Sequence, residues 1–524
     1  MTITDPWQEL HTTALLGTDR RPLPPTPAGP AAGVDRSDPA AALLDLAAME
    51  TVRRRAGARP DPAVQPPTPA GGDSRPEPPS AAVHRLAVLL GGHHTGTANL
   101  GELLPQWLAA ARRYDYRAPA AAVPALLDAA RARSELRPDV VALAGPLGRW
   151  LAGQNPDWKY VHRTATDQPV TGSGQDEQLW QEGLFAERVA LLSRLRRTEP
   201  AAALELLSGS WATERAEDRL LFLDALHEGL SPADESFLEA VLADRSKNVR
   251  ATAAELLSTL PESALAIRMA ERARAAVRLE QADGARLCVS PPAECDAGMQ
   301  RDGIPLKSPT GRGQRAWWFG EVIAAAPLAH WTTGTGLTPE QLLRLPVTDV
   351  DPAGPDWAED LHEAWARAAV RQQHVGWARA LLGPAPRRAG DRAARAAAAP
   401  TAGAPARLLA VLPASERAAW TAAFIQTHGL GEAFQLLGAC ATPWTPPLST
   451  AVVAALERAA ASGAYPWSHS GVLGMTERAL APETAPAVAA LAADATPNSA
   501  WSDTLARLAE TLRFRAVMLA ELSG

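Results

Sequence analysis

The sequence predicts an all-α protein in which short helices pack in series as an α-solenoid, interrupted by Pro- and Gly-rich loop insertions. Apolar residues recur at spacings of three and four, the period of a helix face, and the alternation typical of strands is almost absent. Residues 179–280 divide into helix-length segments with short connections, as between packed antiparallel helices. At 524 residues, the chain also exceeds the roughly 250–300 residues that one core supports.

Proline and glycine divide the chain into segments, because proline removes a backbone donor and fixes φ, so that Pro-rich stretches cannot continue a helix. The predicted segments are N-terminal helices (1–56), a Pro-rich linker (57–80), a helical segment (81–153), a repeat core (179–280), an irregular or hairpin excursion (281–311), a helical segment (312–383), a low-complexity loop (384–406) and a C-terminal helical segment (407–524).

Residues that cap helices mark several helix starts. Asp5-Pro6 precedes the first helix, because Asp can cap and Pro fits the first turn. Ser231 caps another helix, with Asp234 at its positive end, and Thr338–Gln341 is a capping-box pattern. The predicted helices are Trp7–Leu16, Pro39–Arg55, Gln181–Arg196, Pro200–Leu207, Ala216–Gly229, Pro232–Ala243, Asn248–Leu260, Ser263–Glu280, Arg315–Ala325, Pro339–Leu345, Asp356–Leu382 and a long one from Trp501 to Leu522.

The clearest repeat unit runs from Leu230 to Pro261. An acid in the inter-helix turn, Asp244, is followed by Val249 and Arg250 at the start of the next helix, and then by small and apolar residues. Asp244 can cap turn amides or meet Arg250. The pattern resembles the HEAT repeat, and an ordinary helical hairpin with the same cap is the alternative. We interpret Asp244, Val249 and Arg250 as structural residues of a HEAT-like repeat.

The whole chain also resembles an uncharacterised bacterial family, catalogued as a domain of unknown function. The resemblance rests on the stretches Ala14–Arg20, Leu230–Pro261, Arg301–Ile304 and Gly313–Trp331. It carries no catalytic residues. It implies a cytosolic helical-repeat protein associated with MoxR-type ATPases, von Willebrand A-type proteins and SWIM zinc-finger proteins, as an accessory in a metal-linked or chaperone-like assembly.

Composition disfavours several function classes. The net charge is −7, so the chain as a whole lacks the basic surface that phosphate contacts need, and nucleic-acid binding is not expected. Three cysteines argue against a disulfide framework and favour the reducing cytoplasm. No uninterrupted apolar run reaches the roughly 18 residues of a membrane span, so none is predicted.

Few polar groups suggest a ligand site. Adjacent His93 and His94 in a Gly-rich loop could bind a metal or phosphate, and a solvated loop is the alternative. Arg312 and Arg315 precede a helix whose amides could receive an anion, but no phosphate-binding motif is completed. Cys288 and Cys295 are spaced too widely for a typical zinc pair. The sequence therefore predicts no cofactor and no metal site, and these His and Arg residues remain interaction candidates.

Tryptophan is unusually frequent, with 16 Trp against 4 Tyr. Trp365 and Trp377 share roughly one helical face, which favours core packing, but Trp is also enriched among interface anchors. Both are therefore also candidates for lining a partner groove. The one basic cluster, which could touch nucleic acid or an acidic partner or be a solvated loop, comprises Arg387, Arg388, Arg392 and Arg395.

These observations favour a non-catalytic scaffold or accessory subunit that binds a protein partner, since stacked helical repeats present extended binding faces. A MoxR-type ATPase or a von Willebrand A-type protein is the partner that the family resemblance implies. Two alternatives stay open: a nucleic-acid-binding HEAT-like protein, and a metal-handling protein or enzyme with an unrecognised site.

Overall fold

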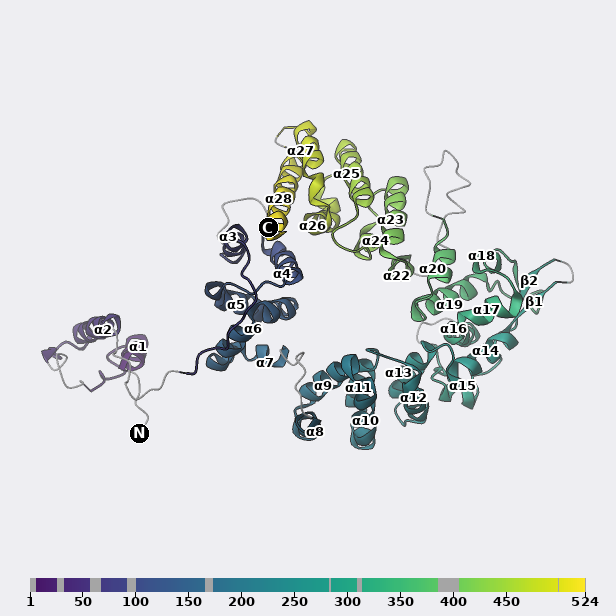
Figure 1. The fold of residues 1–524 in the computed structure, drawn as a ribbon, viewed down its shortest axis with the longest axis horizontal. Coiled ribbons are helices and arrows are strands. Elements are labelled where there is room, and N and C mark those ends of the chain that lie inside the picture. The colour runs from purple at the N-terminus through teal and green to yellow at the C-terminus, as the bar shows by residue number, and fades with distance from the viewer. Residues whose placement is uncertain are drawn as a thin grey trace. The chain divides into compact units, whose positions relative to one another are not determined.

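The computed structural model describes residues 6–25, 33–56, 67–91, 100–164, 173–281, 284–308, 313–384, 405–497 and 499–523. Across these ranges the chain is mostly α-helical and carries one small three-stranded sheet (Figure 1). The α-helical class predicted from the sequence is confirmed. The chain divides into two compact units, Met1–Ala70 and Gly71–Gly524, and the finer segments expected from the sequence stay predictions.

The first unit contains a pair of helices, α1 (Pro6–Leu16) and α2 (Pro39–Arg55). Leu10 of α1 and Leu46 of α2 are buried between them. The Asp38 side chain caps α2 by accepting hydrogen bonds from the first free amides of that helix, which ordinary helix geometry leaves unpaired.

The second unit begins with helices that share one buried core. They are α3 (Ser80–Leu90), η2 (Leu100–Leu103), α4 (Leu104–Arg113), η3 (Ala120–Ala122), α5 (Val123–Ala132), η4 (Ser134–Leu136), α6 (Arg137–Gln154), η5 (Pro156–Trp158) and α7 (Tyr160–Thr164).

Helix α6 is kinked at Gly145, which has φ +52°, directly before Pro146. Pro146 has no N–H to donate to the carbonyl of Ala142 one turn earlier, and a buried carbonyl without a donor is costly. Arg75 supplies the donor from outside the helix, with Nη1 2.9 Å from the Ala142 oxygen, and Asp73 holds the guanidinium. Residues 73–75 of the predicted Pro-rich linker are therefore packed against α6.

Helices then follow one another along the chain, and most of them pack on helices close to them in sequence. They are α8 (Ser173–Glu182), α9 (Phe185–Thr198), α10 (Pro200–Ser210), η7 (Trp211–Thr213), α11 (Ala216–Ala225), η8 (Pro232–Asp234), α12 (Glu235–Val241), α13 (Lys247–Ser258), α14 (Ala264–Ala276), α15 (Ala297–Arg301), α16 (Gln314–Ala325), α17 (Leu328–Thr335), α18 (Pro339–Leu342), α19 (Ala358–Arg371) and α20 (Val375–Leu382).

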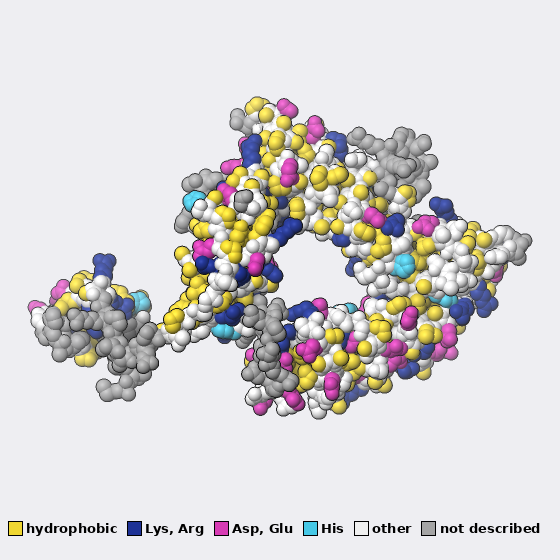
Figure 2. All heavy atoms as spheres, in the orientation of Figure 1, with side chains coloured by type: hydrophobic (Ala, Val, Ile, Leu, Met, Phe, Trp, Pro, Cys, Tyr) yellow, Lys and Arg dark blue, Asp and Glu magenta, His cyan; other side chains and the backbone are white. Residues whose placement is uncertain are grey.

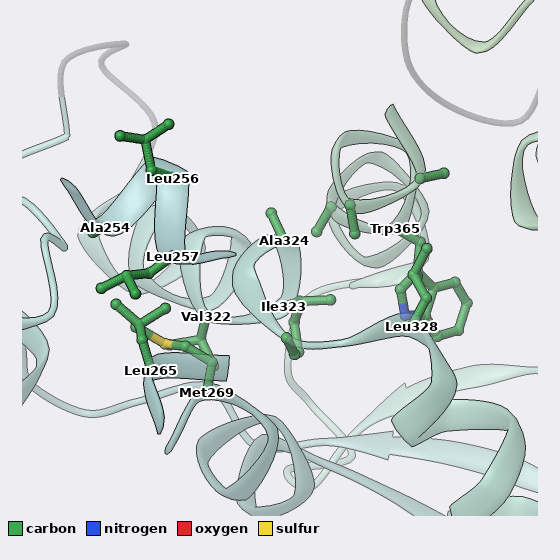
Figure 3. Close-up of a cluster of buried hydrophobic side chains, with 14 of the residues drawn as sticks. Ala254, Leu256, Leu257, Leu265, Met269, Val322, Ile323, Ala324, Leu328 and Trp365 are labelled. Carbon is green, nitrogen blue, oxygen red and sulfur yellow. The ribbon is translucent and has the colours of Figure 1, made fainter. Parts of the chain in front are cut away.

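Their apolar faces form one continuous buried cluster. Figure 3 shows part of it, where Leu257 of α13, Met269 of α14, Ile323 of α16, Leu328 of α17 and Trp365 of α19 belong to the same core. Each helix buries its apolar face against neighbouring helices, and this burial stabilises an amphipathic helix in a stack.

The predicted excursion, 281–311, contains only the second strand of a hairpin, because the first strand precedes it. Strand β1 (Val277–Glu280) pairs antiparallel with β2 (Arg286–Val289), and β2 pairs parallel with β3 (Val347–Asp349). The predicted helix Ser263–Glu280 is wrong at its end, because α14 stops at Ala276 and the next residues pair as β1. β-branched Val277 suits an extended strand, but the helical spacing of the preceding residues does not indicate where the helix ends.

One predicted long helix, Asp356–Leu382, is two helices in the structure, α19 and α20. Gln373 between them has φ +49°, a left-handed conformation that an α-helix cannot contain. His374 then caps α20, its Nδ1 accepting from the Trp377 amide at 3.3 Å. The break lets the two helices fold against each other.

The C-terminal part consists of α22 (Pro405–Val411), α23 (Ala414–His428), α24 (Phe434–Gly438), α25 (Pro446–Ala461), η9 (Pro466–His469), α26 (Ser470–Ala479), η10 (Pro482–Thr484), α27 (Ala485–Asp494) and α28 (Ala500–Ser523).

Helix α28 joins the last helices of the second unit to its first ones (Figure 1). Met518 and Leu522 are buried in the core of α3–α6. Arg85 of α3 donates from Nε to Glu521 Oε2 at 3.0 Å, and Arg515 donates from Nε to Gln106 Oε1 of α4 at 3.0 Å. Segments more than 400 residues apart in the sequence are thus in direct contact.

Candidate protein-binding surfaces

The residues of the predicted repeat unit lie at the turn between α12 and α13. Asp244 Oδ1 accepts from the Ser246 amide at 2.7 Å, so the predicted capping role is confirmed. Its other carboxylate oxygen pairs with Arg219 of α11, not with Arg250. Arg250 instead donates to the main-chain oxygen of Asp244 at 2.7 Å, and Val249 is fully buried. All three residues therefore hold the turn together.

Ion pairs tie successive helices to one another. Arg219 and Asp244 are almost entirely buried, and so are Arg196 of α9 and Asp234 of η8, whose Nη1 and Oδ1 are 2.8 Å apart. Asp234 was expected to interact with the positive end of its helix. It also forms a buried ion pair inside the stack. Buried guanidinium–carboxylate pairs with further hydrogen bonds fix the register of neighbouring helices.

Trp365 and Trp377 do not line a groove. Both are fully buried, with ring centroids 5.0 Å apart, and His362 stacks on Trp365 at 5.8 Å. Their interpretation as partner-binding residues is wrong, because the fold of α20 onto α19 encloses both indoles in the core. Core packing, the interpretation that the sequence favours, is confirmed.

Of the remaining candidates, the structure describes Arg315. Arg315 in the first turn of α16 donates from Nη2 to the Pro291 oxygen at 3.2 Å and ties that helix to the segment after β2. His93, His94, Arg312 and the cluster Arg387–Arg395 lie outside the described residues. Among the residues that the structure describes, no group of three or more His, Cys, Asp or Glu side chains is arranged to hold a metal ion.

An exposed aromatic pair, here called the aromatic platform, lies between α25 and α26 and consists of Tyr465 and Trp467. The two side chains are 64% and 73% exposed, and their rings stack with centroids 6.0 Å apart and an interplanar angle of 19°. Large aromatic side chains usually bury most of their area, so two stacked rings left in solvent are unusual.

The aromatic platform is held by the fold beneath it. Pro466 between the two aromatic residues is buried, and the Trp501 indole of α28 donates to the Ala464 oxygen at 2.5 Å. The Ser468 hydroxyl donates to the Tyr465 oxygen at 2.6 Å. The exposed rings therefore stand on a fixed backbone, which lowers the entropy lost when a partner covers them.

A second surface, here called the acidic groove, is a cavity of about 550 Å³ between α8, α9 and α10. Four acidic residues line it, together with apolar walls. Elsewhere, acidic and basic side chains are interspersed over the face that Figure 2 shows. The acidic residues of the groove are Asp176, Glu177, Glu199 and Glu205.

A third cavity, of about 650 Å³, lies where the first and last helices of the second unit meet. Gln106, Cys440, Trp444 and Arg478 contribute to its wall. Nearby, Arg515 is buried without a carboxylate partner among the described residues, and this burial lowers its pKa to about 10. Its guanidinium donates instead to Gln106 and to main-chain oxygens, so this region serves the contact between helices.

Tyr465 and Trp467 were not among the residues predicted from the sequence. Tyr465-Pro466-Trp467 interrupts the helical spacing of apolar residues, so neither aromatic residue fits the face of a helix. An aromatic residue beside a proline, outside any helical period, was the available signal. The acidic groove had no comparable signal, because its carboxylates lie on α8, at the junction of α9 and α10, and on α10, and the sequence does not specify how these helices pack.

Together these observations define a mostly helical protein in which two buried ion pairs join neighbouring helices. None of the described helices is long and apolar enough to cross a membrane. The chain belongs to a family of unknown function, DUF5691, which matches residues 9–522. No curated protein and no solved structure matches the chain.

Proposed function

We propose that the protein is a non-catalytic scaffold, built from HEAT-like repeats in the manner of an α-solenoid, that binds a protein partner in the cytoplasm. The observation that carries the proposal is the aromatic platform. Trp and Tyr dominate the residues whose loss most weakens protein interfaces, and each buries about 150–250 Å² when covered. Two such rings on a fixed backbone are an anchor that the described part of the chain leaves exposed.

The partner that fits the family resemblance is an ATPase of the MoxR type or a von Willebrand A-type protein, and these are the first candidates to test. Support for a partner of this kind rests on the resemblance alone. The aromatic platform requires only that the partner present an apolar surface or a pocket for the two rings.

Co-purification from native cells tests the proposal. The tagged wild-type chain is expected to retain a stoichiometric protein associate, and the double variant Tyr465→Ala, Trp467→Ala is expected to lose most of it. Because both side chains are exposed, each substitution should change the free energy of unfolding by no more than about 0.5 kcal/mol. Val517→Ala and Leu221→Ala remove exposed apolar side chains elsewhere and serve as matched controls.

Two results would contradict the proposal. One is a wild-type chain that retains no associate under gentle conditions. The other is an associate retained equally by the platform variant and by the two controls.

A further inference from the structure

We infer that the aromatic platform binds a proline-rich segment of the partner in the polyproline II conformation. This inference rests on the proposed scaffold function and names the chemistry that the platform recognises. Polyproline II is an extended, left-handed helix without internal hydrogen bonds.

Each side chain of the aromatic platform has a hydrogen-bond donor free for a ligand. Within the described part of the chain, the Tyr465 hydroxyl and the Trp467 indole Nε1 form no hydrogen bond, and both side chains lie in solvent. The indoles of Trp107 and Trp501, by contrast, donate to main-chain oxygens. The carbonyls of a polyproline II segment are free to accept from such donors, whereas those of an α-helix interior are already paired.

The two rings also present flat apolar faces in a fixed arrangement. They stack with centroids 6.0 Å apart and an interplanar angle of 19°, so each ring has one face turned away from the other. Proline side chains pack on aromatic faces, and domains that recognise Pro-x-x-Pro segments use aromatic-lined grooves. Because both the segment and the backbone beneath the rings are preorganised, little conformational entropy is lost on binding.

The segment of chain that contains the platform favours an uncharged ligand. Residues 459–476 include no Asp, Glu, Lys or Arg, although charged residues make up 21% of the chain. The His469 ring in this segment lies against Trp501, with centroids 6.2 Å apart. A charged residue bound here would lose water without gaining a counter-ion from this segment, which favours proline over the cations that aromatic rings can also bind.

The area of the platform fits a peptide segment better than a folded surface. A covered aromatic side chain buries about 150–250 Å², so the two rings offer at most about 500 Å². A standard interface buries about 800 Å² on each partner. Two copies of this chain docked platform to platform would bury at most roughly 1,000 Å² in total, below the roughly 1,200–2,000 Å² of stable interfaces. The occupant is therefore a segment of the partner and not a second copy.

A third exposed aromatic ring extends the surface. Phe434, at the start of α24, is 46% exposed, and its ring lies over Gly471, where an added Cβ would come within 2.9 Å of it. Gly471 follows Trp467 by about one helical turn. The prolines of a Pro-x-x-Pro segment are about 9 Å apart in polyproline II. We assign one of them to the aromatic platform and the other to Phe434.

Fluorescence anisotropy with the full chain and a short labelled polyproline peptide tests the inference. The variant Tyr465→Ala, Trp467→Ala should weaken binding about tenfold or more, because aromatic anchors dominate such interfaces. The matched control Val517→Ala, Leu221→Ala removes two exposed apolar side chains elsewhere and should bind like wild type. Tyr465→Phe, Trp467→Phe keeps two flat rings but removes both donors, and should bind about threefold to tenfold more weakly than wild type.

A labelled peptide of alternating Leu and Ser residues separates proline recognition from general apolar attraction. It should bind the wild-type chain about tenfold more weakly than the polyproline peptide, because it lacks the preformed conformation. Equal binding of the two peptides would overturn the inference. So would equal binding of the polyproline peptide by wild type and either platform variant, or a wild-type chain that does not bind it.

Two further outcomes distinguish this inference from the scaffold proposal. Loss of the native associate in the variant Tyr465→Ala, Trp467→Ala, without polyproline binding by wild type, refutes this inference but leaves the scaffold. Platform-dependent polyproline binding without any native associate refutes the scaffold proposal alone. Self-association of the wild-type chain that this variant abolishes would identify a second copy as the occupant and overturn the inference.

Discussion

Arg196 and Asp234 form a doubly hydrogen-bonded ion pair inside the helical stack. Nη1 and Nη2 of Arg196 lie 2.8 Å and 2.9 Å from the two oxygens of Asp234, and the side chains are 1% and 2% exposed. The same guanidinium also donates to the main-chain oxygens of Glu228 and Gly229. Arg196 thus joins α9 to the turn that follows α11 and to η8.

Replacement of Asp234 should be strongly destabilising. Asp234→Ala leaves the Arg196 charge buried without its counter-ion, and removal of one partner from a buried pair costs about 3–5 kcal/mol. Glu416→Ala breaks the exposed pair with Arg379 and should cost far less, because solvent screens exposed ion pairs. Urea unfolding followed by circular dichroism measures both free energies. Equal losses for the two variants would show that the buried pair has no special role.

The contact of Arg75 with the kink in α6 makes a second prediction. Arg75→Ala leaves the Ala142 carbonyl without its donor and should cost about 1–3 kcal/mol. Gly145→Ala should also destabilise, because φ is +52° and the new Cβ would lie 2.6 Å from Asp73 Oδ2. Arg113→Ala, an exposed arginine of α4, is the control and should stay within about 0.5 kcal/mol of wild type. Thermal unfolding measures whether the two contact variants lose more stability than the control.

The pH dependence of stability should report the buried His362. Burial lowers the pKa of His362, with Asp356 opposing the shift, and burial together with Arg274 lowers the pKa of His330. The unfolded chain therefore binds these protons more tightly than the folded chain. The contribution of these two histidines to the free energy of unfolding is complete above the ordinary histidine pKa of about 6.5. It is lost as the pH falls below that value toward the lower pKa values of the folded chain.

His362→Phe keeps a flat ring against Trp365 and removes one of these titrations. The variant should lose less stability than wild type between about pH 7.5 and about pH 5, where histidine titrates. Urea unfolding at both pH values gives the comparison. An identical pH dependence for variant and wild type would show that His362 is readily protonated in the folded chain.

Much of the helical organisation could be predicted from local signals. The helix Pro39–Arg55 has the predicted bounds, and Thr338 and Gln341 form the predicted capping box. These features depend on residues close in sequence, so capping and helical spacing suffice to identify them.

Features that depend on distant partners were not predictable in the same way. Core packing of Trp365 and Trp377 was expected, but the fold of α20 back onto α19 after a single left-handed residue, Gln373, was not. Asp234 is a buried ion-pair partner because Arg196 reaches it across a helical hairpin. Helical spacing shows which residues share a face, but not which other element covers that face.

Hydrogen exchange of the chain with and without its native associate tests the central claim most directly. If the aromatic platform anchors the partner, the amides of residues 464–470 should exchange more slowly in the complex, together with those of the start of α26. Protection confined to other helices, with residues 464–470 exchanging at the same rate in both states, would contradict the account.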